Sequence, residues 1–185
     1  MASWDVCYNW LMDNEDETRR FKDSPDPVPV RHNDTPQVVE AKKNARAIGG
    51  INSFYFPNEY AAVIAVEPVN RGLHIEQFYI EHFWNRWLAQ ITSDDVAKRI
   101  FDSAVNQGQG TAVKIAQEAF NSTATKKIDE DGDWGPETLA AINSQDPLFF
   151  VSAFQAQRVG KYLESPSPMV GTAQHPGPLL KRAMK

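Results

Sequence analysis

The sequence is poor in cysteine and has no long apolar run. Its single cysteine, Cys7, cannot form a disulfide within the chain. Because Cys7 lies among Trp4, Tyr8 and Leu11 at helical spacing, we predict a small buried side chain there rather than a catalytic thiol. No segment approaches the roughly 20 apolar residues that a membrane helix needs, so we expect no membrane insertion. The amino-terminal residues lack the basic and apolar regions of a secretory signal peptide, so we expect synthesis in the cytoplasm.

Positive charge is scarce as well. The chain has 19 Lys and Arg residues against 24 Asp and Glu residues, which gives a formal net charge of -5. A protein that binds nucleic acid normally presents a basic surface to the phosphates. We therefore expect no nucleic-acid partner.

Metal-binding spacings are also missing. The histidines show no ligand spacing together with the cysteine, so a zinc site is not expected. The acidic turn at residues 129–133 invites comparison with the calcium loop of an EF-hand, which needs glycine at its sixth position and glutamate at its twelfth. Counted from Asp129, those positions hold Trp134 and Ala140. We expect neither a metal nor a cofactor.

Apolar residues that recur every three or four positions are the main pattern of the chain. No sustained alternation of apolar and polar residues predicts strands. For 185 residues, 42% of them hydrophobic, this pattern predicts a mainly α fold of two packed helical lobes with few or no strands, and we expect a monomer. The expected lobes are residues 1–91, with a long loop at 21–49, and residues 92–185. The expected helices cover residues 4–12, 36–43, 73–88, 93–105, 113–120, 136–142 and 147–159, before a short carboxy-terminal segment at 179–185.

Turn-forming residues interrupt the helical pattern in the first half of the chain. Pro25, Pro27 and Pro29 predict an irregular surface loop, and a loop this long inside a compact domain is more often functional than not. The pair Gly49-Gly50 then predicts a tight backbone turn.

Several motifs follow one another in an order typical of one protein family. The first is an aromatic-led helix that ends in Asn14-Glu15-Asp16, and the second is ARAIGGINS at residues 45–53. Aromatic pairs follow at 78–79 and 83–84. The most specific motifs are IFDSAVNQG at 100–108, AQEA at 116–119 and DGDWGPETL at 131–139. Over nearly the whole chain, this series resembles glycoside hydrolase family 108, the lysozyme-like muramidases of phages and bacteria.

The resemblance implies a lysozyme-like helical fold with a catalytic first half and a peptidoglycan-binding second half. It also implies the activity, which is hydrolysis of the β-1,4 bond between N-acetylmuramic acid and N-acetylglucosamine in the glycan strands of peptidoglycan. Such an enzyme would reach the cell wall after holin-type release or by non-classical export.

Glu15 is the candidate for the catalytic acid. Glycoside cleavage needs a carboxylic acid that stays protonated until it donates its proton to the leaving oxygen. Glu15 lies at the expected end of the first helix, where burial, the helix dipole and the neighbouring Asp16 and Glu17 would all favour the protonated form. The alternative is a solvated acidic helix end, and Glu17 is the second choice for the acid.

The second catalytic group departs from the family pattern. Family members place an Asp and then a Thr between the glutamate and the Gly-Ile turn. Asp23, Asp26 and Asp34 are possible here, and Asp26, beside Pro27, fits best. Ala47 occupies the expected Thr position. This departure leaves open two alternatives: a wall-binding protein that has lost catalysis, and a hydrolase of deacetylated peptidoglycan or a chitosan-like glycan.

Candidates for glycan binding come from two motifs. The turn motif supplies Asn52, Ser53 and Tyr55, and Tyr55 would either stack on a sugar ring or pack in the core. Asp102 and Asn106 lie four positions apart on one helical face, where they would either border the glycan cleft or tie the helix to neighbouring backbone.

Overall fold

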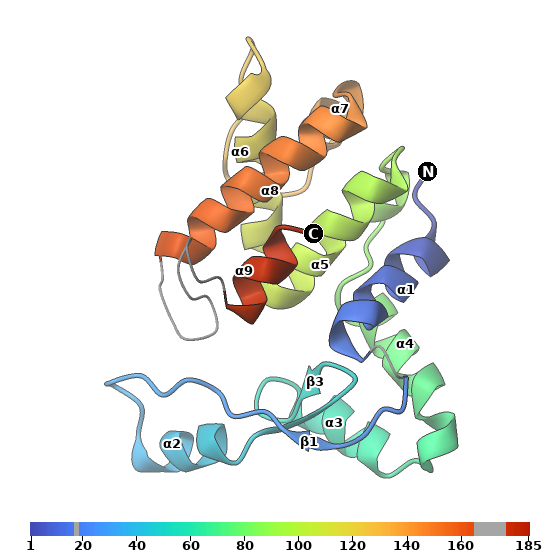
Figure 1. Ribbon diagram of the computed structural model, residues 1–185, viewed down its shortest axis with the longest axis vertical. Coiled ribbons are helices and arrows are strands. Elements are labelled where there is room, and N and C mark those ends of the chain that lie inside the picture. Colours follow the sequence, from blue (N-terminus) through green and yellow to red (C-terminus); the bar gives the residue numbers. More distant parts are fainter. Residues whose placement is uncertain (17–18, 165–176) are drawn as a thin grey trace. The chain divides into compact units, whose positions relative to one another are not determined.

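The computed structural model describes residues 1–16, 19–164 and 177–185, and it is mainly helical, as predicted (Figure 1). The described chain forms two compact units. The smaller unit is Leu11–His82, and the larger unit joins Met1–Trp10 to Phe83–Lys185. The division therefore falls within the first helix, α1 (Trp4–Glu15), rather than only after residue 91 as expected.

Contacts of the first residues explain this division. The Trp4 ring packs edge-on against the rings of Trp84 and Phe101, with centroids 5.3 and 5.8 Å away. The Ser3 backbone N–H donates a hydrogen bond to the Asp94 carboxylate at 2.6 Å. Cys7 is completely buried, as predicted. The amino terminus is thus part of the core of the larger unit.

The smaller unit contains the only sheet among the described residues, with β1 (Ser24–Pro25), β2 (Arg46–Ile48) and β3 (Ile51–Asn52) in the order β1-β2-β3. Both pairs are antiparallel, with Ala47 opposite Ser24 on one side and Asn52 on the other. The expected long loop at 21–49 therefore contributes two strands. The loop also contains helix α2 (Pro36–Lys43). The smaller unit continues with α3 (Pro57–Ile64), the short 3₁₀ helix η1 (Pro68–Asn70) and α4 (Arg71–His82).

Helix α2 has the predicted bounds, because the residues that mark its start are adjacent to it in the sequence. The Thr35 hydroxyl accepts a hydrogen bond from the Val38 N–H at 3.4 Å, and Pro36 occupies the first turn, where no backbone N–H is needed.

Helix α4 ends earlier than predicted, at His82 rather than residue 88. The Asn85 side chain accepts hydrogen bonds from the N–H groups of Trp87 and Leu88, at 2.9 and 3.0 Å. An asparagine that captures backbone donors in this way competes with the helix. The aromatic run that follows His82 is therefore a turn that leads into the 3₁₀ helix η2 (Leu88–Gln90).

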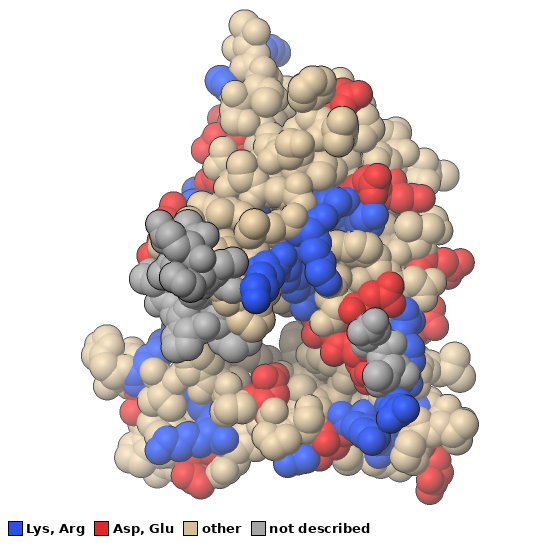
Figure 2. All heavy atoms as spheres, in the orientation of Figure 1, with Lys and Arg blue, Asp and Glu red and all other residues tan. Residues whose placement is uncertain are grey.

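The larger unit is built from helices that pack on one another (Figure 1). Helix α6 (Gln109–Thr123) packs against both α5 (Asp94–Gln107) and α8 (Pro147–Glu164). The remaining helices are α7 (Pro136–Ser144) and α9 (Pro178–Ala183). None of the helices in the described part of the chain has the length and apolar character to cross a membrane. Acidic and basic side chains lie intermixed on the face drawn in Figure 2.

Candidate active site

The smaller unit contains a pocket of about 420 Å³ at the end of α1. This volume falls within the roughly 300–1,000 Å³ of small-molecule sites. Two candidate catalytic carboxylates, Glu15 and Asp26, both line it, and so does Ala47. The pocket is completed among described residues by Asp16, Arg20, Lys22, Ser24, Pro25, Gly49 and Gly50. Glu17, the second choice for the acid, lies outside the described residues.

The turn between β2 and β3 lies close to the Glu15 carboxylate. Gly49 and Gly50 have φ values of +53° and +82°, the left-handed pair required by a two-residue hairpin loop. A Cβ atom on Gly50 would lie 3.0 Å from Glu15 Oε2 and would collide with the Tyr79 hydroxyl. Glycine at this position therefore lets the half-buried Glu15 carboxylate approach the backbone of the turn.

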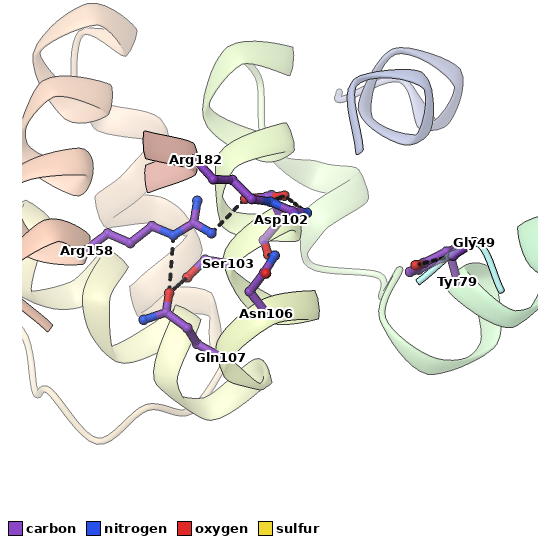
Figure 3. Close-up of polar contacts among 8 residues, drawn as sticks. All are labelled: Gly49, Tyr79, Asp102, Ser103, Asn106, Gln107, Arg158 and Arg182. Atoms are coloured by element: carbon purple, nitrogen blue, oxygen red, sulfur yellow. Dashed lines mark hydrogen bonds and ion pairs between the residues drawn. The ribbon is translucent and has the colours of Figure 1, made fainter. Parts of the chain in front are cut away.

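Tyr79 fixes the same turn from the other side. Its buried hydroxyl donates a hydrogen bond to the Gly49 carbonyl oxygen at 2.9 Å (Figure 3). The turn is thus held by a side chain from α4, while Glu15 approaches it from α1.

Asp26 follows β1 and is held by its own backbone and by Asn52. The Asp26 N–H donates to the Ala45 carbonyl oxygen at 2.9 Å. The Asn52 amide donates to Asp26 Oδ2 at 2.7 Å and to the Asp26 carbonyl oxygen at 3.0 Å. Asn52 is only 8% exposed and its amide is bound to Asp26, which makes it a positioning residue for Asp26 in place of the glycan-binding group that we expected.

The other two candidate aspartates are engaged elsewhere and do not line the pocket. Asp23 accepts from Arg46 Nε at 2.5 Å and from the Tyr60 hydroxyl at 2.7 Å. Burial raises the pKa of Tyr60, and this hydrogen bond to Asp23 raises it further. Asp34 accepts from the Arg31 N–H at 2.6 Å and from Lys42 Nζ at 2.7 Å, contacts that hold the pKa of Asp34 below its usual value. Asp26 is therefore the candidate aspartate that shares the pocket with Glu15.

Ser53 and Tyr55 do not line this pocket. The Ser53 hydroxyl accepts from the Arg46 N–H at 2.9 Å and continues the β2–β3 pairing. The Tyr55 ring is 61% exposed and meets the Phe54 ring edge-on. Of its two expected roles, packing in the core is therefore excluded, and it remains available to a ligand that extends beyond the pocket.

Asp102 and Asn106 belong to the larger unit, on helix α5. Asp102 is fully buried, and its carboxylate forms ion pairs with Arg158, at 2.7 Å, and with Arg182 (Figure 3). The Asn106 amide donates to the Asp102 carbonyl oxygen at 2.8 Å. The full burial of Asp102 contradicts its placement at a glycan cleft and fits the structural alternative, because its ion pairs join α5 to α8 and α9. Asn106 is half-buried and bonds within α5, so its role in glycan binding stays a prediction.

Sequence reasoning missed several residues at the pocket. Arg20 and Lys22 flank Phe21, whose ring is buried. The only signal in the sequence is an aromatic residue between cations in a polar loop. Within the described ranges, no group of three or more His, Cys, Asp or Glu side chains could hold a metal ion. The arrangement offers acid–base chemistry between carboxylates.

Comparison with known protein families gives no match to this chain, and comparison with curated proteins gives none either.

Proposed function

We propose that the chain is a lysozyme-type glycoside hydrolase that cleaves the β-1,4 bond between N-acetylmuramic acid and N-acetylglucosamine in peptidoglycan. The observation that carries the proposal is that Glu15 and Asp26, from separate elements, line one pocket of about 420 Å³. Paired carboxylates in a sugar-sized pocket are the group set that glycoside hydrolysis requires. The motifs that resemble glycoside hydrolase family 108 support the same assignment.

Glu15 is the proton donor in this proposal. Its side chain is half-buried against the Gly49-Gly50 turn, beside the bond to be cleaved. As the bond between the anomeric carbon and the bridging oxygen breaks, the Glu15 proton passes to that oxygen, which leaves as a hydroxyl group. The sugar that remains carries positive charge at its anomeric carbon.

Asp26 acts on that positive charge and on the water that completes the reaction. Its carboxylate, held by the Asn52 amide, stabilises the cationic sugar. The water adds its hydroxyl group to the anomeric carbon and gives up a proton, which restores the carboxyl group that donated one. Ala47 lines the same pocket and supplies only a methyl group, so Asp26 is the group that contacts the water.

One observation favours a second candidate, a wall-binding protein without catalysis. Ala47 lies opposite Asn52 in the sheet and offers no hydroxyl group to the pocket, where the resembling family has one. Such a protein would bind glycan strands without releasing reducing ends. A hydrolase of deacetylated strands would release them from deacetylated walls more rapidly than from acetylated walls.

The test measures the release of reducing ends from purified peptidoglycan by the wild type, Glu15→Gln and Asp26→Asn. We expect Glu15→Gln to lose at least about 100-fold in rate, because general acid catalysis contributes roughly 10²–10⁴-fold. Glu40→Gln, an exposed carboxylate on α2 outside the pocket, is the matched control and should keep the wild-type rate. Equal rates for Glu15→Gln and the control would reject Glu15 as the acid, and an inactive wild type that still binds walls would favour the second candidate.

A further inference from the structure

Two basic side chains, Arg20 and Lys22, line the pocket beside its carboxylates. Both are exposed, and neither forms an ion pair or a hydrogen bond with any residue in the described part of the chain. Arg19, the residue before Arg20, is by contrast paired with Asp13 at 2.9 Å. The two positive charges at the pocket are therefore not engaged in contacts with the described part of the protein.

Phe21 fixes the backbone between these two cations. Its ring is 8% exposed and lies against Gly49 and Gly72, where a Cβ atom would come within 3.1 and 3.2 Å of it. Its N–H donates to Asp16 Oδ2 at 2.7 Å, and its carbonyl oxygen accepts from Arg71 Nη1 at 3.1 Å. Burial of the ring and hydrogen bonds at both backbone groups thus hold the residues on either side at the pocket.

The same contacts affect the charge of the pocket. Asp16 is a lining residue, but its carboxylate accepts the Phe21 N–H and so serves the loop. Besides the proposed acid Glu15, the pocket lining contains two aspartates, Asp16 and Asp26, and the two basic residues. The formal charges of these four residues balance. Both aspartates are held by contacts within the fold, Asp16 by the Phe21 N–H and Asp26 by the Asn52 amide, whereas Arg20 and Lys22 have no such contact among the described residues and can bind an anionic ligand.

We propose that Arg20 and Lys22 bind a carboxylate of the glycan next to the bond to be cleaved, and that they make the site selective for acidic amino-sugar polymers over neutral ones. This inference rests on the proposed hydrolase function. In peptidoglycan, every second sugar carries a lactyl group, which bears either a free carboxylate or a stem peptide with carboxylates of its own. Chitin-like polymers carry neither.

The expected magnitude follows from the exposure of the two side chains. An exposed ion pair in water contributes up to about 1 kcal/mol, roughly a fivefold change in affinity for each charge, and salt screens it. Removal of both charges should therefore raise KM by up to about 25-fold at low salt, and by less at high salt. The value of kcat should not change, because the charges act on binding.

The experiment compares matched polymers. The first is peptide-free glycan strands with the lactyl carboxylate, and the second is the same strands with that carboxyl group reduced to an alcohol. The third is intact peptidoglycan, in which the stem peptide supplies the carboxylates. The enzymes are the wild type, the double variant Arg20→Gln/Lys22→Gln, and Lys43→Gln, an exposed cation outside the pocket.

We expect the double variant to raise KM on at least one carboxylate-bearing polymer and to leave KM on the reduced strands at the wild-type value. A rise on peptide-free strands assigns the ligand to the lactyl carboxylate, and a rise on intact peptidoglycan alone assigns it to the stem peptide. An unchanged KM, or an equal rise on the reduced strands, overturns the inference. Lys43→Gln should behave as the wild type on all three polymers.

A fourth enzyme, Glu15→Gln, separates this inference from the proposed function. If the wild type cleaves the polymers, Glu15→Gln does not, and the double variant matches the wild type, only the carboxylate-binding role fails. If the wild type cleaves none of them, the hydrolase function fails and the inference fails with it. A thermal unfolding midpoint close to that of the wild type verifies that the double variant is folded.

Discussion

Replacement of Gly50 by alanine tests how the pocket is built. Gly50 has a φ of +82°, and the new Cβ atom would meet the Tyr79 hydroxyl and come within 3.0 Å of Glu15 Oε2. The variant Gly50→Ala must therefore move Tyr79 away from the turn, which breaks its 2.9 Å hydrogen bond to the Gly49 carbonyl oxygen. The Glu15 carboxylate has to move as well.

Two contributions set the expected loss of stability. A non-glycine residue in the left-handed region costs about 1–2 kcal/mol. A buried hydrogen bond that is broken, with its acceptor left unsatisfied, costs about 1–3 kcal/mol. For Gly50→Ala, the free energy of unfolding should fall by about 2–5 kcal/mol. In a Tyr79→Phe background the hydroxyl is already gone, so the same change should cost only the backbone contribution, about 1–2 kcal/mol.

The assay is urea unfolding of the wild type, both single variants and the double variant, which together form a double-mutant cycle. The two changes should couple by about 1–3 kcal/mol, because each removes the same hydrogen bond. If Gly50→Ala costs the same with and without the Tyr79 hydroxyl, the steric account of the turn is wrong. Hydrolysis by the folded fraction of Gly50→Ala should also fall, since Glu15 is displaced.

Three further predictions concern Ala47, Asp102 and Cys7. Ala47→Thr should raise the rate of glycan hydrolysis about fivefold, because one hydroxyl that contacts the attacking water contributes roughly 1 kcal/mol. Ala47→Val, which has the same shape but no hydroxyl, should not raise the rate. Equal rates for the two variants would contradict this prediction. Asp102→Asn should lower the free energy of unfolding, measured in urea, by about 3–5 kcal/mol, because the buried Arg158 loses its counter-charge. The KM of the folded fraction should stay unchanged. A raised KM would indicate that Asp102 contacts the glycan. Burial, together with the nearby negative charge of Asp94, raises the pKa of Cys7 to about 12. Iodoacetamide should therefore label the native protein at about pH 9 far more slowly than the urea-unfolded chain. Rapid labelling of the native protein would contradict the burial of Cys7. Because the folded state favours the neutral thiol, burial of Cys7 should contribute its full stabilisation below about pH 9, and this stabilisation should decline as the pH rises towards 12.

Local signals made part of the fold predictable. Thr35 and Pro36 mark the start of α2, and Pro136 and Pro147 begin α7 and α8 where the sequence predicts them. The Gly49-Gly50 turn was predicted for the same reason, because glycine alone tolerates both of its backbone angles readily. These features depend on residues that are neighbours along the chain.

Features that depend on distant residues were not predictable in the same way. The pairing of β1 with β2 places Ser24 opposite Ala47, and strands this short are not predicted by any alternation of apolar and polar residues. The burial of Asp102 depends on Arg158 and Arg182, which lie on later helices, so the spacing of Asp102 on its own helix could not decide between a cleft and a core.

Some residues of the candidate site could be predicted from the sequence and others could not. Glu15 and Asp26 were both named from the sequence, and both line the pocket. Arg20 and Lys22 reach it only because Phe21 is buried between them and hydrogen-bonded at both backbone groups. The role of Asn52 as support for Asp26 depends on strand register, which the short strands did not reveal.

Identification of the fragments released from peptidoglycan tests the central claim most directly. Digests by the wild type and by Glu15→Gln are reduced with borohydride, and the new sugar ends are analysed by mass spectrometry. The account predicts N-acetylmuramitol ends from the wild type and essentially none from Glu15→Gln. New ends of another sugar, no new ends from the wild type, or the same yield from both proteins would contradict it.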